Sequence, residues 1–170
     1  MAAIEATTVE LPQAVLMPDE IRAFVSDLAA QPEFWRPHAL HDGRRHFANA
    51  IGNEFCDVFV ISWSEGSDTG FHDHGLASGA VACCLGQVVE ERLRIGRENR
   101  RTILSAGDAI SFDGSHVHRM TDAGTGPAVT IHAYSPRPER IGQFAFEADG
   151  TVRRVEISWA AELVNAAAGL

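Results

Sequence analysis

The sequence predicts a single all-β domain, a sandwich or barrel preceded by a short helical cover. Past residue 50, short apolar runs are separated by glycines at intervals of about 8–12 residues, which is typical of such folds. The clearest helical pattern of apolar residues lies before that point. The chain of 170 residues is long enough for one domain with a sizeable core, and no internal repeat or linker divides it.

Residues 1–50 are expected to form an N-terminal arm and the helical cover. Residues 1–17 are mixed in composition and predict a loose arm. Residues 31–43 contain two prolines and predict irregular structure. Between them, a helix is predicted from Pro18 to about Ala30, because apolar side chains recur at helical spacing at Ile21, Phe24, Val25 and Leu28.

Residues 51–157 are expected to form the barrel, and residues 158–170 a short C-terminal helix capped by Ser158. We treat residues 1–170 as one domain. The predicted strands are 56–63, 79–85, 87–95, 100–104, 108–112, 116–121, 128–134, 143–147 and 151–157.

Composition excludes several classes of partner. The net charge is −9 and no run of basic residues is longer than two, so we expect no nucleic-acid partner. No apolar run approaches the roughly 20 residues that span a bilayer, and we expect neither a membrane partner nor a signal peptide. The three cysteines, Cys56, Cys83 and Cys84, suggest no disulfide framework, which favours the cytoplasm.

The most informative motif is His72-Asp73-His74. On an extended segment, side chains alternate, so the two histidines point to the same side and Asp73 points away. Two imidazoles on one side can share a metal ion such as iron, zinc, copper or nickel. His118 is a third candidate ligand farther along the chain, and His116 competes with it as part of a second H-x-H motif.

The spacing of these residues resembles the two motifs of the cupins. The first motif, G-x5-H-x-H-x3/4-E-x6-G, is matched from Gly66 through both histidines to Gly86, except that Gly79 stands at the glutamate position. The second motif, which begins at Gly107, selects His118 over His116 and leaves His116 as a loop or pocket-rim residue. In this motif three further positions differ from the pattern, namely Asp113, Ser115 and Asp122. The resemblance implies a double-stranded β-helix, or jelly-roll, barrel.

The glycine at the glutamate position changes the charge of the predicted metal site. Three neutral imidazoles leave a divalent metal with its full charge, and such a site favours an anionic ligand. A thiol fits this requirement, because a coordinating thiol is deprotonated.

A second group of polar residues follows on the predicted strand 128–134. Thr130, His132 and Tyr134 alternate along it and therefore face one side. A tyrosine beside a metal can donate a hydrogen bond to a substrate, and the histidine can orient it. The alternative is a buried polar ladder without a catalytic role.

Three stretches of the sequence together resemble the cysteine dioxygenase-like thiol dioxygenases, notably their bacterial branch. The first runs from Trp63 and Gly66 to H-D-H, the second is H-R-M, and the third is T-I-H-A-Y-S-P. The resemblance covers roughly residues 44–145. It implies a non-haem Fe(2+) held by His72, His74 and His118, and oxidation of a small thiol by O2 to a sulfinic acid. It also implies a catalytic triad, in which Thr130 takes the place of the family's serine beside His132 and Tyr134.

Two positions bear on the substrate. Gly79 stands where the animal enzymes carry a cysteine that crosslinks to the tyrosine, so no such crosslink can form. The family's carboxylate-binding arginine lies about 26 residues before the first metal histidine. That register reaches His46, preceded by Arg44 and Arg45, and makes these three residues the substrate-binding candidates. Cysteine and 3-mercaptopropionate are the expected substrates, and a homodimer is left open.

The residues alone leave three other functions open. One is a cupin dioxygenase acting on a substrate that is not a thiol. Another is a cupin that binds a small ligand or a metal without catalysis. The third is a zinc or nickel hydrolase or isomerase, because three histidines also hold catalytic zinc.

Overall fold

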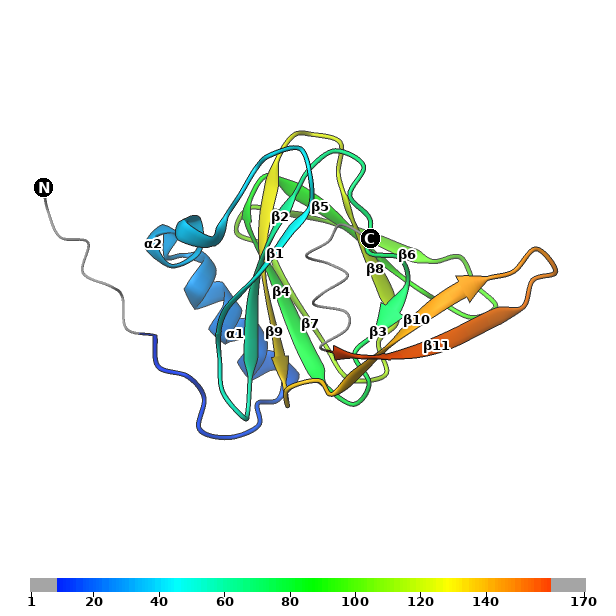
Figure 1. Cartoon of the computed structure of the whole chain (residues 1–170), viewed down its shortest axis with the longest axis horizontal. Coiled ribbons are helices and arrows are strands. Elements are labelled where there is room, and N and C mark those ends of the chain that lie inside the picture. The colour runs from blue at the N-terminus through cyan, green and yellow to red at the C-terminus, as the bar shows by residue number, and fades with distance from the viewer. Residues whose placement is uncertain (1–8, 160–170) are drawn as a thin grey trace, which may run out of the picture.

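In a computed structural model of the chain, which describes residues 9–159, two antiparallel β-sheets face each other behind a helical cover (Figure 1). The helical elements are α1 (Pro18–Ala29), α2 (Pro32–Trp35) and the 3-10 turn η1 (Arg36–His38). The strands are β1 (His46–Gly52), β2 (Asp57–Trp63), β3 (His72–Asp73), β4 (Ser78–Leu85), β5 (Gln87–Arg92), β6 (Arg100–Ser105), β7 (Ala109–Phe112), β8 (His118–Asp122), β9 (Ala128–Ser135), β10 (Arg140–Phe146) and β11 (Val152–Ser158).

The order of the strands confirms the predicted all-β class. One sheet runs β1-β2-β9-β4-β7 and the other β11-β10-β3-β8-β5-β6. The β10–β11 hairpin extends away from the body of the barrel (Figure 1). Within residues 9–159, no helix is long and apolar enough to cross a bilayer.

Helix α1 covers the outer face of the first sheet, as its apolar pattern predicts. Its buried residues Ile21, Val25 and Leu28 join one apolar cluster with outward-facing residues of β2, β4 and β9. The helix carries Asp19 and Glu20 in its first turn, where acidic groups are favourable. Strand β2 is therefore buried on both faces, which explains its nearly continuous apolar sequence.

The inner faces of the two sheets enclose the main core. In β2, Val58 and Val60 belong to the outer cluster, whereas Phe59, Ile61 and Trp63 belong to the inner one. The same alternation in β9 sends Val129, Ile131 and Ala133 to the outer cluster. Thr130, His132 and Tyr134 of that strand consequently face the interior of the barrel, where they are buried.

Every strand predicted from the sequence has a counterpart within a few residues, but two strands and the short α2 were not predicted. Strand β1 begins at His46, inside the region assigned to the helical cover, and β3 has only two residues. Strand β11 extends through Ser158. The C-terminal helix expected for 158–170 falls almost wholly on residues outside the described part of the chain and stays a prediction.

Candidate functional site

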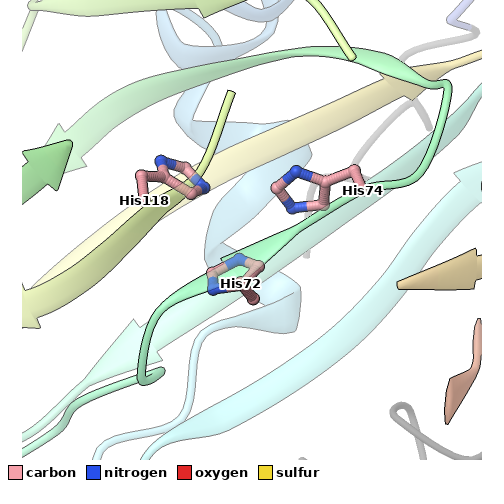
Figure 2. A group of neighbouring side chains, drawn as sticks. All are labelled: His72, His74 and His118. Carbon is pink, nitrogen blue, oxygen red and sulfur yellow. The ribbon is translucent and has the colours of Figure 1, made fainter. Parts of the chain in front are cut away.

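The three histidines of the predicted metal site meet inside the barrel (Figure 2). Strand β3 pairs with β8, and in this register His72 lies directly opposite His118. Their ring centroids are 4.8 Å apart. His74 follows β3 and brings its ring to 4.8 Å from that of His72 and 5.3 Å from that of His118. Sheet pairing therefore joins a local H-x-H motif to a distant third histidine.

Hydrogen bonds orient two of the three rings. Nδ1 of His72 lies 3.0 Å from the carbonyl oxygen of Gly70, and Nδ1 of His118 lies 3.3 Å from Oε1 of Glu90. Both partners are acceptors, so each Nδ1 carries the ring hydrogen and each Nε2 keeps its lone pair. Burial, reinforced by the neighbouring His118, lowers the pKa of His72 to about 3. Burial also lowers the pKa of His74 and His118, so all three rings are neutral.

The cluster fits a divalent metal ion. The histidine nitrogens that could serve as ligands all lie within 4.8 Å of one another. Nδ1 of His74 is buried and has no hydrogen-bond partner within residues 9–159. A buried polar atom left without a partner costs about 1–3 kcal/mol. This cost is expected where rings are arranged to bind an ion rather than one another.

Glu90 of β5 forms a second buried group around His118. Its Oε1 lies 2.6 Å from Nε2 of His116 as well as 3.3 Å from Nδ1 of His118. His116 lies in the loop between β7 and β8, as predicted, but it is buried there, with 7% of its surface exposed. Burial alone would raise the pKa of Glu90, but the hydrogen bonds with His116 and His118 outweigh it and hold the pKa at about 2. Glu90, His116 and His118 could themselves hold a metal, but His116 and Glu90 already satisfy each other.

The alternating polar residues of β9 form a continuous hydrogen-bonded chain. Thr130 Oγ1 lies 2.9 Å from Nε2 of His132, and Nδ1 of His132 lies 3.3 Å from the Tyr134 hydroxyl. The indole N–H of Trp63 donates to Thr130 Oγ1 at 2.8 Å, a contact that the sequence did not predict. Burial lowers the pKa of His132 well below its usual value, so this ring is neutral too. The Tyr134 ring lies 4.5 Å from that of His74, which places the end of the chain beside the histidine cluster.

A small cavity opens onto both groups. It encloses about 450 Å³, counting the open space at its mouth. Its walls include His72, His74, His132 and Tyr134. Apolar side chains make most of the remaining wall, namely Phe47, Ile61, Met120, Ile141 and Trp159. The cavity is therefore mostly apolar, and it lies beside the histidine cluster.

Of the three basic candidates for substrate binding, the structure brings only Arg45 to this cavity. Its Nη1 donates to the carbonyl oxygen of Asp68 at 2.8 Å, which fixes the guanidinium. Among the described residues that line the cavity, it is the only arginine or lysine. Arg44 pairs instead with Asp42 and is 74% exposed, and His46 also contacts Asp42. Alternation along the chain explains this, since Arg45 and Phe47 face inward and their neighbours face outward.

Gly79 lies directly opposite Tyr134 in the β4–β9 pairing. The space that a side chain would need there is filled by Phe112 of β7. A Cβ atom at position 79 would lie 2.5 Å from Cε2 of Phe112 and 3.0 Å from Cδ1 of Tyr134. Phe112 in turn stacks on His74 with a centroid distance of 5.3 Å. The absence of a side chain at Gly79 thus leaves room for Phe112, which forms an aromatic wall beside the histidine cluster.

We expect Gly79→Cys to destabilise the protein by about 1–3 kcal/mol, because it inserts atoms into space that Phe112 occupies. Urea unfolding of the wild type and the variant measures the effect. In a protein that already carries Phe112→Leu, adding Gly79→Cys should cost less stability than it costs in the wild type, because the smaller leucine leaves room for the new side chain. An unchanged unfolding midpoint for Gly79→Cys would show that Phe112 moves aside at little cost.

The residues between and after the metal-ligand candidates point away from them, as predicted. Asp73 accepts hydrogen bonds from Nε and Nη2 of Arg154 at 2.6 and 2.9 Å. This attaches β3 to β11 across the intervening β10. Arg119 pairs with Glu91 at 2.9 Å on the outer face of its strand.

The three cysteines are packing groups rather than reactive thiols. Burial raises the pKa of Cys56 and Cys84 to about 12, and that of Cys83 to about 11. A thiol in this state is not the thiolate that acts as a nucleophile or a metal ligand. None of the three lines the cavity beside the histidine cluster.

Comparison with known proteins identifies relatives of most of the chain. Residues 11–146 match the family model described as cysteine dioxygenase type I. The cysteine dioxygenase type 1 of Danio rerio is 26% identical over 130 residues, and that of Rattus norvegicus is 25% identical over 129 residues. Each alignment covers 69% of this chain and 65% or 64% of the relative, so the match spans just under two thirds of these relatives.

Solved structures support the fold. A Klebsiella pneumoniae protein with a double-stranded β-helix domain superimposes with a TM-score of 0.50 at 16% identity, covering 69% of this chain and 90% of that one. A recombinant oxalate oxidase in complex with glycolate gives a TM-score of 0.52 at 14% identity, covering 64% and 61%. The barrel is thus the double-stranded β-helix that the cupin motifs imply. Since the family model spans most of the chain, the protein belongs to the cysteine dioxygenase type I family.

Proposed function

We propose that this chain is an iron(II)-dependent thiol dioxygenase that converts a small thiol carboxylate into its sulfinic acid. The observation that carries the proposal is that one cavity is lined by members of both groups: His72 and His74 of the histidine cluster, and His132 and Tyr134 of the hydrogen-bonded chain on β9. The reaction balances without a further reductant, because both atoms of O2 are added to sulfur and the thiol supplies all the electrons.

His72, His74 and His118 are the residues that would hold the metal. Iron(II) bound there would supply the redox chemistry that activates O2. The three rings are neutral and leave the charge of the ion uncompensated by direct ligands, so an anionic sulfur is favoured beside them. The surrounding apolar wall limits water at this end of the cavity and strengthens electrostatic interactions.

Arg45 is the residue proposed to bind the substrate carboxylate. A guanidinium presents parallel N–H donors that match the two oxygens of a carboxylate. Its anchor to Asp68 restricts its motion, so less ordering is needed when the substrate binds. A carboxylate at Arg45 would direct the sulfur of a short thiol toward the histidine cluster.

Tyr134 is proposed to donate a hydrogen bond to the reacting groups. Because Trp63 donates to Thr130 Oγ1, the threonine hydroxyl can donate to Nε2 of His132. The ring hydrogen of His132 then lies on Nδ1 and faces the oxygen of Tyr134. In this arrangement the tyrosine oxygen is an acceptor for His132, and its own hydrogen can be donated toward the cavity.

Oxygen uptake with a panel of thiols tests the proposed function. The full chain is loaded with iron(II) under anaerobic conditions and mixed with O2 and cysteine, 3-mercaptopropionate or 2-aminoethanethiol. We expect uptake with a thiol that carries a carboxylate, and a sulfinic acid containing two atoms of labelled oxygen. Iron binding without thiol-dependent uptake would contradict the proposal and favour a binding protein or an enzyme with a different substrate.

Replacing Arg45 with methionine is expected to raise KM for the carboxylate-bearing substrate by about 10- to 100-fold, the usual worth of a hydrogen bond with a charged group. The change keeps an unbranched side chain against the apolar wall. Steady-state oxygen uptake measures KM and kcat separately. Arg44→Met is the matched control, because Arg44 is the exposed neighbour that pairs with Asp42, and it should leave KM unchanged. An equal effect of both variants would exclude Arg45 as the specific contact.

A further inference from the structure

The carboxylate that is absent from the proposed ligand set has a counterpart that contacts one of its histidines, His118. Gly79 occupies the position of the cupin glutamate, yet Glu90 lies buried inside the barrel and is 5% exposed. The β5–β8 pairing explains its location, since Glu90 lies opposite Met120 and Arg92 lies opposite His118. Glu90 and His118 are therefore diagonal neighbours on the inner face of the sheet.

The contacts of Glu90 determine how His118 faces the other two histidines. Oε1 of the carboxylate lies 3.3 Å from Nδ1 of His118. An ionised carboxylate can only accept, so the ring hydrogen of His118 must be on Nδ1. The lone pair of His118 is then on Nε2. A neutral imidazole in the opposite tautomer would present a hydrogen at Nε2 and could not bind a metal through that atom.

His116 keeps this carboxylate in place. Its Nε2 lies 2.6 Å from the same Oε1 atom, and its ring stacks on Phe112 with an interplanar angle of 10°. A buried carboxylate without partners is costly, whereas one that accepts two hydrogen bonds is stable. The arrangement holds a negative charge next to His118 without adding a carboxylate to the group formed by His72, His74 and His118.

We propose that Glu90 and His116 are positioning residues of the metal centre: Glu90 fixes the tautomer and raises the basicity of His118, and His116 holds Glu90. Carboxylate–histidine–metal arrangements act in this way around metals generally. This proposal rests on the part of the proposed function in which the three histidines bind a metal. It does not depend on which thiol is oxidised.

The test measures metal affinity in the absence of any thiol. Wild-type full chain, Glu90→Gln and Glu90→Ala are titrated with iron(II) under anaerobic conditions, and with cobalt(II) as a spectroscopic probe. We expect affinity to fall by about 10- to 100-fold, because this is the usual loss when such an outer partner is removed. Glu90→Gln keeps an acceptor oxygen but removes the charge, so its metal affinity should fall by less than that of Glu90→Ala.

Glu91→Gln is the matched control, since Glu91 is the next residue on the same strand and pairs with Arg119 on the other face. Its metal affinity should equal that of the wild type. His116→Asn provides a second variant that leaves Glu90 in place, and it should weaken metal binding by a smaller factor than Glu90→Ala. Unfolding midpoints of all variants show whether each is folded before titration.

Nitrogen-15 NMR of the histidines in the metal-free protein supplies a readout that general loosening of the fold would not mimic. We expect His118 in the wild type to be the Nδ1–H tautomer, and Glu90→Ala to shift it toward Nε2–H. A wild-type His118 with its hydrogen on Nε2 would overturn the proposal. So would folded Glu90 variants with unchanged affinity, or a second equivalent of metal bound by the Glu90, His116 and His118 group.

The outcomes separate this inference from the proposed function. If the wild type binds one metal and the Glu90 variants bind it weakly, the inference stands even when no thiol is oxidised. If thiols are oxidised but Glu90→Ala binds iron as tightly as the wild type, only the inference fails. A wild type that binds no metal overturns both.

Discussion

Replacing His72 with alanine is expected to reduce affinity for iron(II) by more than about 100-fold, the loss seen when even an outer partner of a metal ligand is removed. Thiol-dependent oxygen uptake should fall to background at the same time. His72 is the most informative of the three ligand candidates to remove, because it is only partly buried, whereas His74 and His118 are almost fully buried. Its loss therefore leaves less of a cavity in the core.

Two measurements test this prediction: the metal content after anaerobic loading, and the rate of oxygen uptake. His41→Ala is the control, since His41 is exposed and lies in the segment before β1. It should retain full metal content. A His72→Ala protein that keeps the iron content and activity of the wild type would show that the ligand set is wrong, whereas equal loss in both variants would indicate nonspecific damage.

The second large effect is expected from Tyr134→Phe, which removes one hydroxyl from the cavity and preserves the ring. We expect kcat to fall by about 100- to 1000-fold, as when a single donor to a reacting group is removed. KM and iron content should change little, because Arg45 and the three histidines are untouched. Steady-state kinetics on samples of equal iron content make the measurement.

Substitutions of Thr130, which is linked to Tyr134 through His132, add a second comparison to this test. Thr130→Ser keeps the hydroxyl that links Trp63 to His132, so it should lose far less activity than Tyr134→Phe. Thr130→Val removes that hydroxyl and leaves the Trp63 N–H unsatisfied. Its loss of activity should lie between those of Thr130→Ser and Tyr134→Phe. Wild-type kcat in Tyr134→Phe would mean that the β9 residues form a structural polar ladder.

The sequence was sufficient to predict the elements whose signals are local. Strand β2 has a long apolar run bounded by turns, and α1 has a clear helical period, so both were predicted with nearly correct bounds. Strand β1 was missed because its sequence, His46–Gly52, is rich in alanine, asparagine and glycine, which are poor β-formers. Strand β3 has only two residues and exists through its pairing with β8 and β10.

The same distinction applies to the site. The spacing of His72, His74 and His118 follows a family motif, and all three meet as that motif implies. The role of Glu90 depends on the register between β5 and β8, which no local pattern displays. Its one signal in the sequence is an acidic residue at an inward position, two residues after the buried Val88. For Arg45, the family register reaches the adjacent His46, and alternation along the chain identifies which neighbour faces the cavity.

The two-residue strand β3 links metal binding to the folding of the barrel. His72 lies opposite His118 only when β3 has docked between β8 and β10, so the ligand set does not exist in the unfolded chain. An ion that binds the folded state alone stabilises it by an amount that grows with the logarithm of its concentration, about 2.7 kcal/mol at 100 times Kd. Under the proposed function, the supply of metal should therefore contribute to the stability of the folded chain as well as to its activity.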